Sequence, residues 1–276
     1  MRKIVMSSKA EYTDYNNLDF PEVVYKYRSG TNPYHRTIFT EEILFFSPPC
    51  NFEDKLDCRN SERYDLLTDD EILDNYEKIL KKKNPSWDHL YLRYMAIKWS
   101  NEGLLRDSAR LKFIESNDWI ELNERFGVLS VTAVPDNIKM WRKYSNRFNG
   151  FCVGFNSKKL FKGMGGGGKV EYVKNLPVIH PFAPAIEKRT LLTFFKLNKW
   201  KFEKEYRLQN FWPNPIGDDE RKWKFPKESF CEIILGEKLS NKSKQQLIAF
   251  ALALNPKVEI KLASKENNFV LIKPFA

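Results

Sequence analysis

The chain has 276 residues, of which 42% are hydrophobic and 14% aromatic, so it can bury a sizeable core of its own. This composition excludes a disordered tail and a small disulfide-stapled domain. The 46 Lys and Arg residues outnumber the 36 Asp and Glu residues, which gives a net charge of +10.

The sequence carries no signal for a membrane or for export. Its longest uninterrupted apolar run covers residues 247–254, well short of the roughly 18–20 residues that cross a bilayer. The first residues turn polar too soon for a signal peptide. The four cysteines lack the spacing of a zinc knuckle or redox pair, and the three histidines are scattered. We therefore expect a cytoplasmic protein with reduced thiols, no membrane contact and no metal site.

The excess positive charge is concentrated in one part of the chain. Residues 53–88 hold 11 acidic and 7 basic side chains, whereas residues 139–227 hold 20 basic and 7 acidic ones. A region this positive attracts polyanions or small anions, more weakly as salt rises. A solvated positive surface that binds nothing in particular is an equally good reading of charge alone.

The first third of the chain predicts strands and then helices. Alternation predicts a strand over 23–29, and a short apolar run that ends at Pro48 predicts another within 41–49. From Thr68 the apolar period changes to about 3.6, and the spacing of Thr68 and Glu71 predicts a capping box. We predict three helices here, the second over 87–99 and the third over 104–114. They make a helical insertion at about residues 62–124.

Strand and helix signals alternate in the rest of the chain. One α+β domain over residues 1–276, with small mixed or antiparallel sheets around a cleft, explains this order most simply. The last strand is expected at the edge of its sheet. The predicted strands are 126–134, 151–155, 169–173, 199–211, 231–236 and 258–262, and the predicted helices are 136–148 and 241–254.

The glycine-rich segment 163–168 matches part of a phosphate-loop pattern. That loop needs a strand before it, a helix after it, and Ser or Thr after its Lys. Here Val170 follows Lys169, and a strand is predicted there. We interpret the segment as a flexible connection between two strands.

Two carboxylates in the segment 199–211 are the strongest candidates for chemistry. If residues 203–208 are extended, Glu203, Glu205 and Arg207 share one face of a strand, because side chains alternate with a period of two. Trp200, Phe202, Tyr206 and Leu208 would then occupy the other face. The alternative is a solvated Glu–Arg ion pair, worth at most about 1 kcal/mol.

The predicted helix 136–148 has aromatic and basic positions. Met140, Trp141, Tyr144 and Phe148 recur at helical spacing, which favours packing in the core over a stacking platform. Arg142, Lys143 and Arg147 occupy other positions and are candidate contacts to a nucleic acid.

Several segments, in their order along the chain, resemble a bacterial family, the domain-of-unknown-function family 2971. They are YKYRS, LFFSPPCNFEDKLD, VTAVPDNIKMWRKYSNRFNGFCVGF, WKFEKEYR and CEIILGE. The loop Asn51–Lys55 departs from the Asn-Asp-Pro form of the family, and residues of about 61–124 do not align with it. This resemblance does not name an activity.

The order of Arg28, Ser47 and the Glu203/Glu205 pair is also similar to the Arg, Ser and Glu-x-Glu arrangement of ADP-ribosyltransferases. Those enzymes bind NAD in a cleft between two small sheets and need no glycine-rich motif. The resemblance implies that Arg28 grips the pyrophosphate of NAD and that Glu205 stabilises the ribosyl cation.

The same resemblance implies roles for four further residues. Ser47 would orient Glu205 or the ribose, Tyr25 or Tyr27 would stack on nicotinamide, and Glu203 would position the acceptor nucleophile. The acceptor would be a nucleic acid or an acidic protein, held by the positive region. Such an enzyme could be a bacterial toxin or an anti-phage effector, and whether an inhibitory partner protein exists stays open.

Two other functions fit the sequence. One is a nucleic-acid-binding protein or a nuclease that holds magnesium with Asp54, Asp57, Glu203 and Glu205. The other is a protein without catalytic activity that binds a partner and uses the Glu-x-Glu-x-Arg segment as an ion-paired surface. The transferase hypothesis requires Arg28, Ser47 and Glu205 to line one cleft.

Overall fold

The computed structural model describes residues 20–275, and it is α+β, as predicted. Its main sheet has eight strands in the order β12-β11-β10-β4-β1-β3-β8-β5. Neighbouring strands are antiparallel except for the parallel pair β10 and β11. The strands are β1 (Val23–Ser29), β3 (Phe126–Thr132), β4 (Gly150–Asn156), β5 (Gly167–Lys169), β8 (Glu205–Phe211), β10 (Phe230–Gly236), β11 (Glu259–Glu266) and β12 (Phe269–Pro274).

The main sheet is divided between β1 and β3. Strand β1 pairs with β4 along its whole length, and β3 does the same with β8. Between β1 and β3, however, the pairing is limited to Tyr25 and Thr132. We call β12-β11-β10-β4-β1 the first half-sheet and β3-β8-β5 the second half-sheet. This arrangement agrees with the prediction of small sheets.

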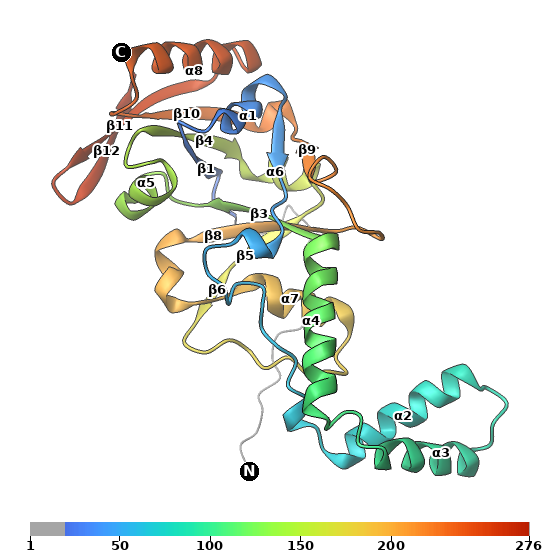
Figure 1. Ribbon diagram of the computed structural model, residues 1–276. Helices are drawn as coiled ribbons and strands as arrows, with labels where there is room; N and C mark the ends of the chain where they lie inside the picture. The colour runs from blue at the N-terminus through green and yellow to red at the C-terminus, as the bar shows by residue number, and fades with distance from the viewer. Residues whose placement is uncertain (1–19, 276) are drawn as a thin grey trace.

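Helices and two small sheets surround the half-sheets (Figure 1). Strand β2 (Ile43–Phe45) pairs with β9 (Lys222–Lys224), and β6 (Glu171–Val173) pairs with β7 (Phe195–Leu197). The helices are α1 (Thr37–Thr40), α2 (Asp69–Lys83), α3 (His89–Asn101), α4 (Ser108–Arg125), α5 (Ile138–Tyr144), α6 (Ser157–Gly163), α7 (Ala185–Phe194) and α8 (Asn241–Leu254). None of the helices within residues 20–275 combines the length and the apolar character that a membrane span requires.

Hydrophobic clusters cover both faces of the first half-sheet. On one face, Val153 of β4 and Ile233 of β10 pack with Leu247 of α8. On the other face, Cys152 packs with Trp141 of α5. Strands that are buried on both faces are continuously apolar rather than alternating. This is why 151–155 and 231–236 could be predicted as strands from composition alone.

The predicted helical insertion corresponds to α2, α3 and α4. The capping box of Thr68 and Glu71 is present at the start of α2. Helices α2 and α3 share a hydrophobic cluster of their own, in which Ile72 and Leu80 of α2 contact residues such as Leu92 of α3. Both lie beyond the far end of α4, away from the main sheet (Figure 1).

Three predicted elements need correction. Residues 199–211 are not one strand, because Asn198–Glu203 forms a 3-10 helix and Lys204 is left-handed (φ 41°), so β8 begins at Glu205. Strand β11 is not at the edge, since β12 pairs with it. The predicted strand 169–173 is divided into β5 and β6, which belong to different sheets.

The glycine-rich segment joins helix α6 to β5 rather than two strands, so that prediction was also wrong. Its glycines have structural tasks: Gly165 and Gly166 adopt positive φ angles. A Cβ atom on Gly167 would lie 2.2 Å from the carbonyl oxygen of Arg207, so only glycine lets β5 approach β8 here.

Candidate functional site

A pocket of about 1080 Å³ is bordered by both half-sheets. Arg28 of β1, Ser47 after β2 and Glu205 of β8 all line it, although they come from separate parts of the chain. The volume is slightly above the roughly 300–1,000 Å³ that is usual for small-molecule sites. The pocket therefore satisfies the geometric requirement of the transferase hypothesis.

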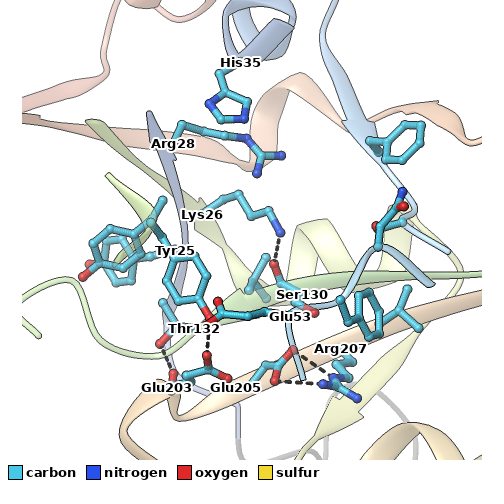
Figure 2. A pocket seen from close by; sticks show the side chains of 18 of the residues that line it. Tyr25, Lys26, Arg28, His35, Glu53, Ser130, Thr132, Glu203, Glu205 and Arg207 are labelled. Atoms are coloured by element: carbon cyan, nitrogen blue, oxygen red, sulfur yellow. Dashed lines mark hydrogen bonds and ion pairs between the residues drawn. The ribbon is translucent and has the colours of Figure 1, made fainter. Parts of the chain in front are cut away.

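Cationic side chains line one side of this pocket. Lys26 and Arg28 project from the same face of β1, and His35 lies beside Arg28 (Figure 2). The Lys26 ammonium donates a hydrogen bond to the carbonyl oxygen of Ser130 at 2.5 Å. That bond spans the division between β1 and β3, where few backbone bonds join the strands.

The Arg28 guanidinium has no carboxylate partner among residues 20–275. Burial lowers its pKa to about 10, and the Cys152 thiol raises it slightly. Its cationic neighbour Lys26 has its own pKa lowered to about 7, by burial first and then by Arg28. A half-buried arginine beside another cation is a favourable place for an anionic ligand.

Buried charges fill the opposite end of the pocket. Glu205 accepts hydrogen bonds from Arg207 at 2.8 and 3.0 Å and from Lys196 at 3.0 Å. Arg207 also forms a bidentate pair with Asp57 at 2.6 and 2.8 Å. Lys196 donates to Glu203 at 2.7 Å. We call this set the charge cluster, and its members are Asp57, Lys196, Glu203, Glu205 and Arg207.

Glu205 is held in its ionised form. Burial alone would raise its pKa, but Arg207 and Lys196 outweigh burial and hold the pKa well below its usual range. Hydrogen bonds from Arg207, Lys196 and the Ser130 hydroxyl occupy most of the lone pairs of this carboxylate. Glu205 is therefore a fixed negative charge at the wall of the pocket.

Glu203 differs from Glu205 in the direction of its pKa shift and in the number of its lone pairs that are occupied. Burial raises its pKa, and the nearby Glu205 charge adds to the effect although Lys196 opposes it. Its two oxygens accept from Lys196 and from the Tyr144 hydroxyl, which leaves lone pairs for a further donor. Glu203 is thus the carboxylate of the charge cluster whose pKa is raised and which keeps room for a further donor.

Ser47 was predicted to orient Glu205, but a different serine contacts that carboxylate. The Ser47 hydroxyl lies 3.5 Å from the carbonyl oxygen of Pro48, and its backbone pairs with Val128 of β3. The serine that bonds to Glu205 is Ser130, on β3. Ser47 remains a lining residue of the pocket.

The two tyrosines of β1 border the pocket, but Tyr27 is unsuited to stacking on a ligand. Its ring packs edge-on against Trp141 with centroids 5.3 Å apart, and its hydroxyl donates to the carbonyl oxygen of Val134 at 3.0 Å. Tyr25 packs against the same cluster. The reason is alternation, since Lys26 and Arg28 take the face of β1 that points into the pocket (Figure 2).

The acidic residues of the predicted magnesium site come together only in part. Asp57, Glu203 and Glu205 converge, but on the ammonium of Lys196 and the guanidinium of Arg207, which occupy the place of a metal ion. Asp54 pairs instead with Lys199 at 3.3 Å. Within residues 20–275, no group of three or more His, Cys, Asp or Glu side chains could hold a metal ion.

The predicted nucleic-acid contacts lie in a second, smaller groove of about 540 Å³. Arg142 and Arg147 are exposed there, whereas Lys143 forms an ion pair with Glu53 and lies over Trp200. The aromatic residues of this segment are mostly buried, as predicted: Trp141 stacks on Phe148 at 5.3 Å in the core. Lys238 and Lys265 also line the groove, together with the acidic Glu237.

Lys26, Lys196 and Ser130 were not among the predicted site residues, and Asp57 was predicted only as a magnesium ligand. Lys26 could have been found, because it alternates with Arg28 on a predicted strand. Asp57 and Lys196 gave no local signal for the charge cluster, since Asp57 is 150 positions from the Arg207 that binds it. Ser130 was likewise inconspicuous within an apolar strand.

Comparisons of the chain with protein-family models, curated proteins and solved structures found no match. The resemblances that the sequence motifs carry therefore stay predictions.

Proposed function

We propose that the protein is an ADP-ribosyltransferase-like enzyme that binds NAD in the large pocket and transfers ADP-ribose to a macromolecular acceptor. One observation carries the proposal: Arg28, Ser47 and Glu205 line the same pocket. The pocket also presents cations at one side and a buried excess of carboxylates at the other. That polarity fits a substrate with an anionic diphosphate and a reacting sugar that becomes positive.

In the proposed reaction the bond between nicotinamide and the ribose breaks, and nicotinamide leaves with the bonding electrons. Positive charge then develops on the ribose. The charge cluster has three carboxylates and two cations, so its net charge is negative when all are ionised. A fixed charge of this sign stabilises the transition state more than the substrate.

The acceptor forms the new bond to the ribose and must lose a proton. We assign that proton to Glu203, because burial raises its pKa above the ordinary value of a glutamate and it keeps lone pairs for a donor. The Tyr144 hydroxyl and the Lys196 ammonium hold its carboxylate in place. Activity is expected to rise with pH as Glu203 loses its proton.

The decisive experiment is incubation of the protein with NAD labelled in its adenine ring, together with separate pools of protein, RNA and DNA. Transfer of label to one pool identifies the acceptor class. Release of nicotinamide without labelling would make the protein an NAD hydrolase. The absence of both, in a protein whose unfolding transition is cooperative, would contradict the proposal.

We propose nucleic acid rather than an acidic protein as the acceptor, because Arg142, Arg147, Lys238 and Lys265 outnumber the single acid, Glu237, in the lining of the groove. Replacing Arg142 and Arg147 together with alanine should weaken the binding of single-stranded nucleic acid. The slope of log affinity against log salt should become smaller by about 1.4, since each phosphate contact on a single strand contributes roughly 0.7. An unchanged slope, measured by fluorescence anisotropy over a salt series, would contradict this assignment.

A further inference from the structure

Two side chains of the large pocket are unusual for charged groups. Arg28 faces no carboxylate within the described residues, and the ammonium of Lys26 hydrogen-bonds a neutral carbonyl, that of Ser130. In the same pocket, Arg207 and Lys196 have carboxylates at 2.6–3.1 Å. The contrast indicates that the cations of β1 are arranged for a partner outside the chain.

The spacing of the two cations suits a diphosphate. Residues i and i+2 of a strand lie roughly 6.5–7 Å apart along one face. Figure 2 shows the side chains of Lys26 and Arg28 pointing into the same space, with the Lys26 amino group on the side toward Glu205. Adjacent phosphates of one ligand can therefore contact a different cation each.

We propose that Arg28 and Lys26 form a diphosphate-binding site in which Lys26 exchanges the carbonyl of Ser130 for a phosphate of the ligand. This inference rests on the proposed function, because it assigns the diphosphate of NAD or ADP-ribose to these two residues. It adds Lys26 as a binding residue and couples binding to pH.

The surroundings of Lys26 explain the proton uptake. Burial and Arg28, followed by the more distant Arg207, lower its pKa to about 7, whereas Glu205 and Glu203 oppose the shift. At pH 8 most of the lysine is then neutral. A bound diphosphate brings negative charge beside the amine, which raises its pKa, so the complex binds a proton that the free protein does not.

His35 is the other titratable group beside Arg28, and the choice of pH separates it from Lys26. Its Nδ1 donates to the carbonyl oxygen of Ser29 at 3.0 Å. Burial and Arg28 lower its pKa to about 4, and Lys26 contributes to the same shift. At pH 8 it is neutral, and a ligand would have to raise its pKa by roughly four units to protonate it.

Calorimetric titration with ADP-ribose at pH 8, in two buffers of different ionisation enthalpy, tests the site. ADP-ribose has no group of its own that titrates near pH 8. We expect binding with uptake of roughly one proton per ligand. Lys26→Met should weaken binding about 10–100-fold and abolish the uptake. Lys26→Arg should bind within about threefold of the parent but without uptake, because its guanidinium stays charged.

Several outcomes would overturn the proposal. Failure of ADP-ribose to bind, binding without proton uptake, or uptake that disappears in His35→Ala but persists in Lys26→Met would each contradict it. The unfolding midpoint of Lys26→Met should not fall, since the variant removes a half-buried amine that has no carboxylate partner among the described residues, and this separates loss of binding from loss of fold. Proton-coupled binding without any transfer from NAD would refute the enzyme assignment and leave this site intact.

Discussion

Glu205→Gln is expected to reduce transfer of label from NAD by about 10²–10³-fold, the cost of removing one preorganised electrostatic group from an active site. Glutamine keeps the shape and the hydrogen-bonding oxygen but loses the charge. The negative charge beside the ribosyl cation then disappears, because Asp57 and Glu203 only balance Lys196 and Arg207. Binding of ADP-ribose should change far less, since the cations of β1 are untouched.

The Glu205→Gln experiment needs a control for folding, because Glu205 is buried and ion-paired. Asp57 still pairs with both cations in this variant, so we expect a cooperative unfolding transition. Glu228→Gln makes the same chemical change at an exposed position and should leave transfer unaltered. Unchanged labelling by a folded Glu205→Gln protein would mean that the charge cluster only stabilises the fold.

Arg207→Met should lower the free energy of unfolding by about 3–5 kcal/mol, the range found when one partner of a buried ion pair is removed. Arg207 is 1% exposed, and it binds both Asp57 and Glu205. Without the guanidinium, these carboxylates share only the ammonium of Lys196. Urea denaturation measures the effect, and Arg110→Met, an exposed substitution on α4, should change the midpoint little.

A double-mutant cycle shows whether the loss comes from the unpaired carboxylate. Adding Asp57→Asn to Arg207→Met removes that charge, so the two substitutions together should lower the free energy of unfolding by less than the sum of their separate effects. If the two effects simply add, Asp57 and Arg207 do not stabilise each other.

The free energy of unfolding also depends on pH in a defined direction. Because the folded pKa of Glu205 lies below its unfolded value, its contribution is present at neutral pH and is lost as pH falls below about 4.5.

The elements that could be predicted are those with a strong local pattern. The strand 23–29 and the helix 241–254 were predicted at their observed bounds, and the capping box placed the start of α2. The length of α4 could not be predicted, because none of its side chains is buried and its apolar positions become sparse beyond Ile114. The fold class was clear from the order of the segments.

The resemblance to ADP-ribosyltransferases picked out Arg28, Ser47 and Glu205, which line one pocket, and local alternation accounts for part of the rest. Lys26 and Arg28 follow from the alternation of β1. The start of β8 did not follow from alternation, because the chain leaves the 3-10 helix through a left-handed Lys204 that no local residue signal requires. The charge cluster joins segments brought together by tertiary packing, and pairing at such separation has no signature in one sequence.

The single backbone pairing between Tyr25 and Thr132 has a mechanical consequence. The cations of β1 belong to one half-sheet and the carboxylate of Glu205 to the other, so a small rotation at this junction changes the width of the pocket without breaking a ladder of hydrogen bonds. A ligand that contacts both sides ties the half-sheets together. Amide hydrogens along β1 and β3 should then exchange more slowly with solvent when such a ligand is bound.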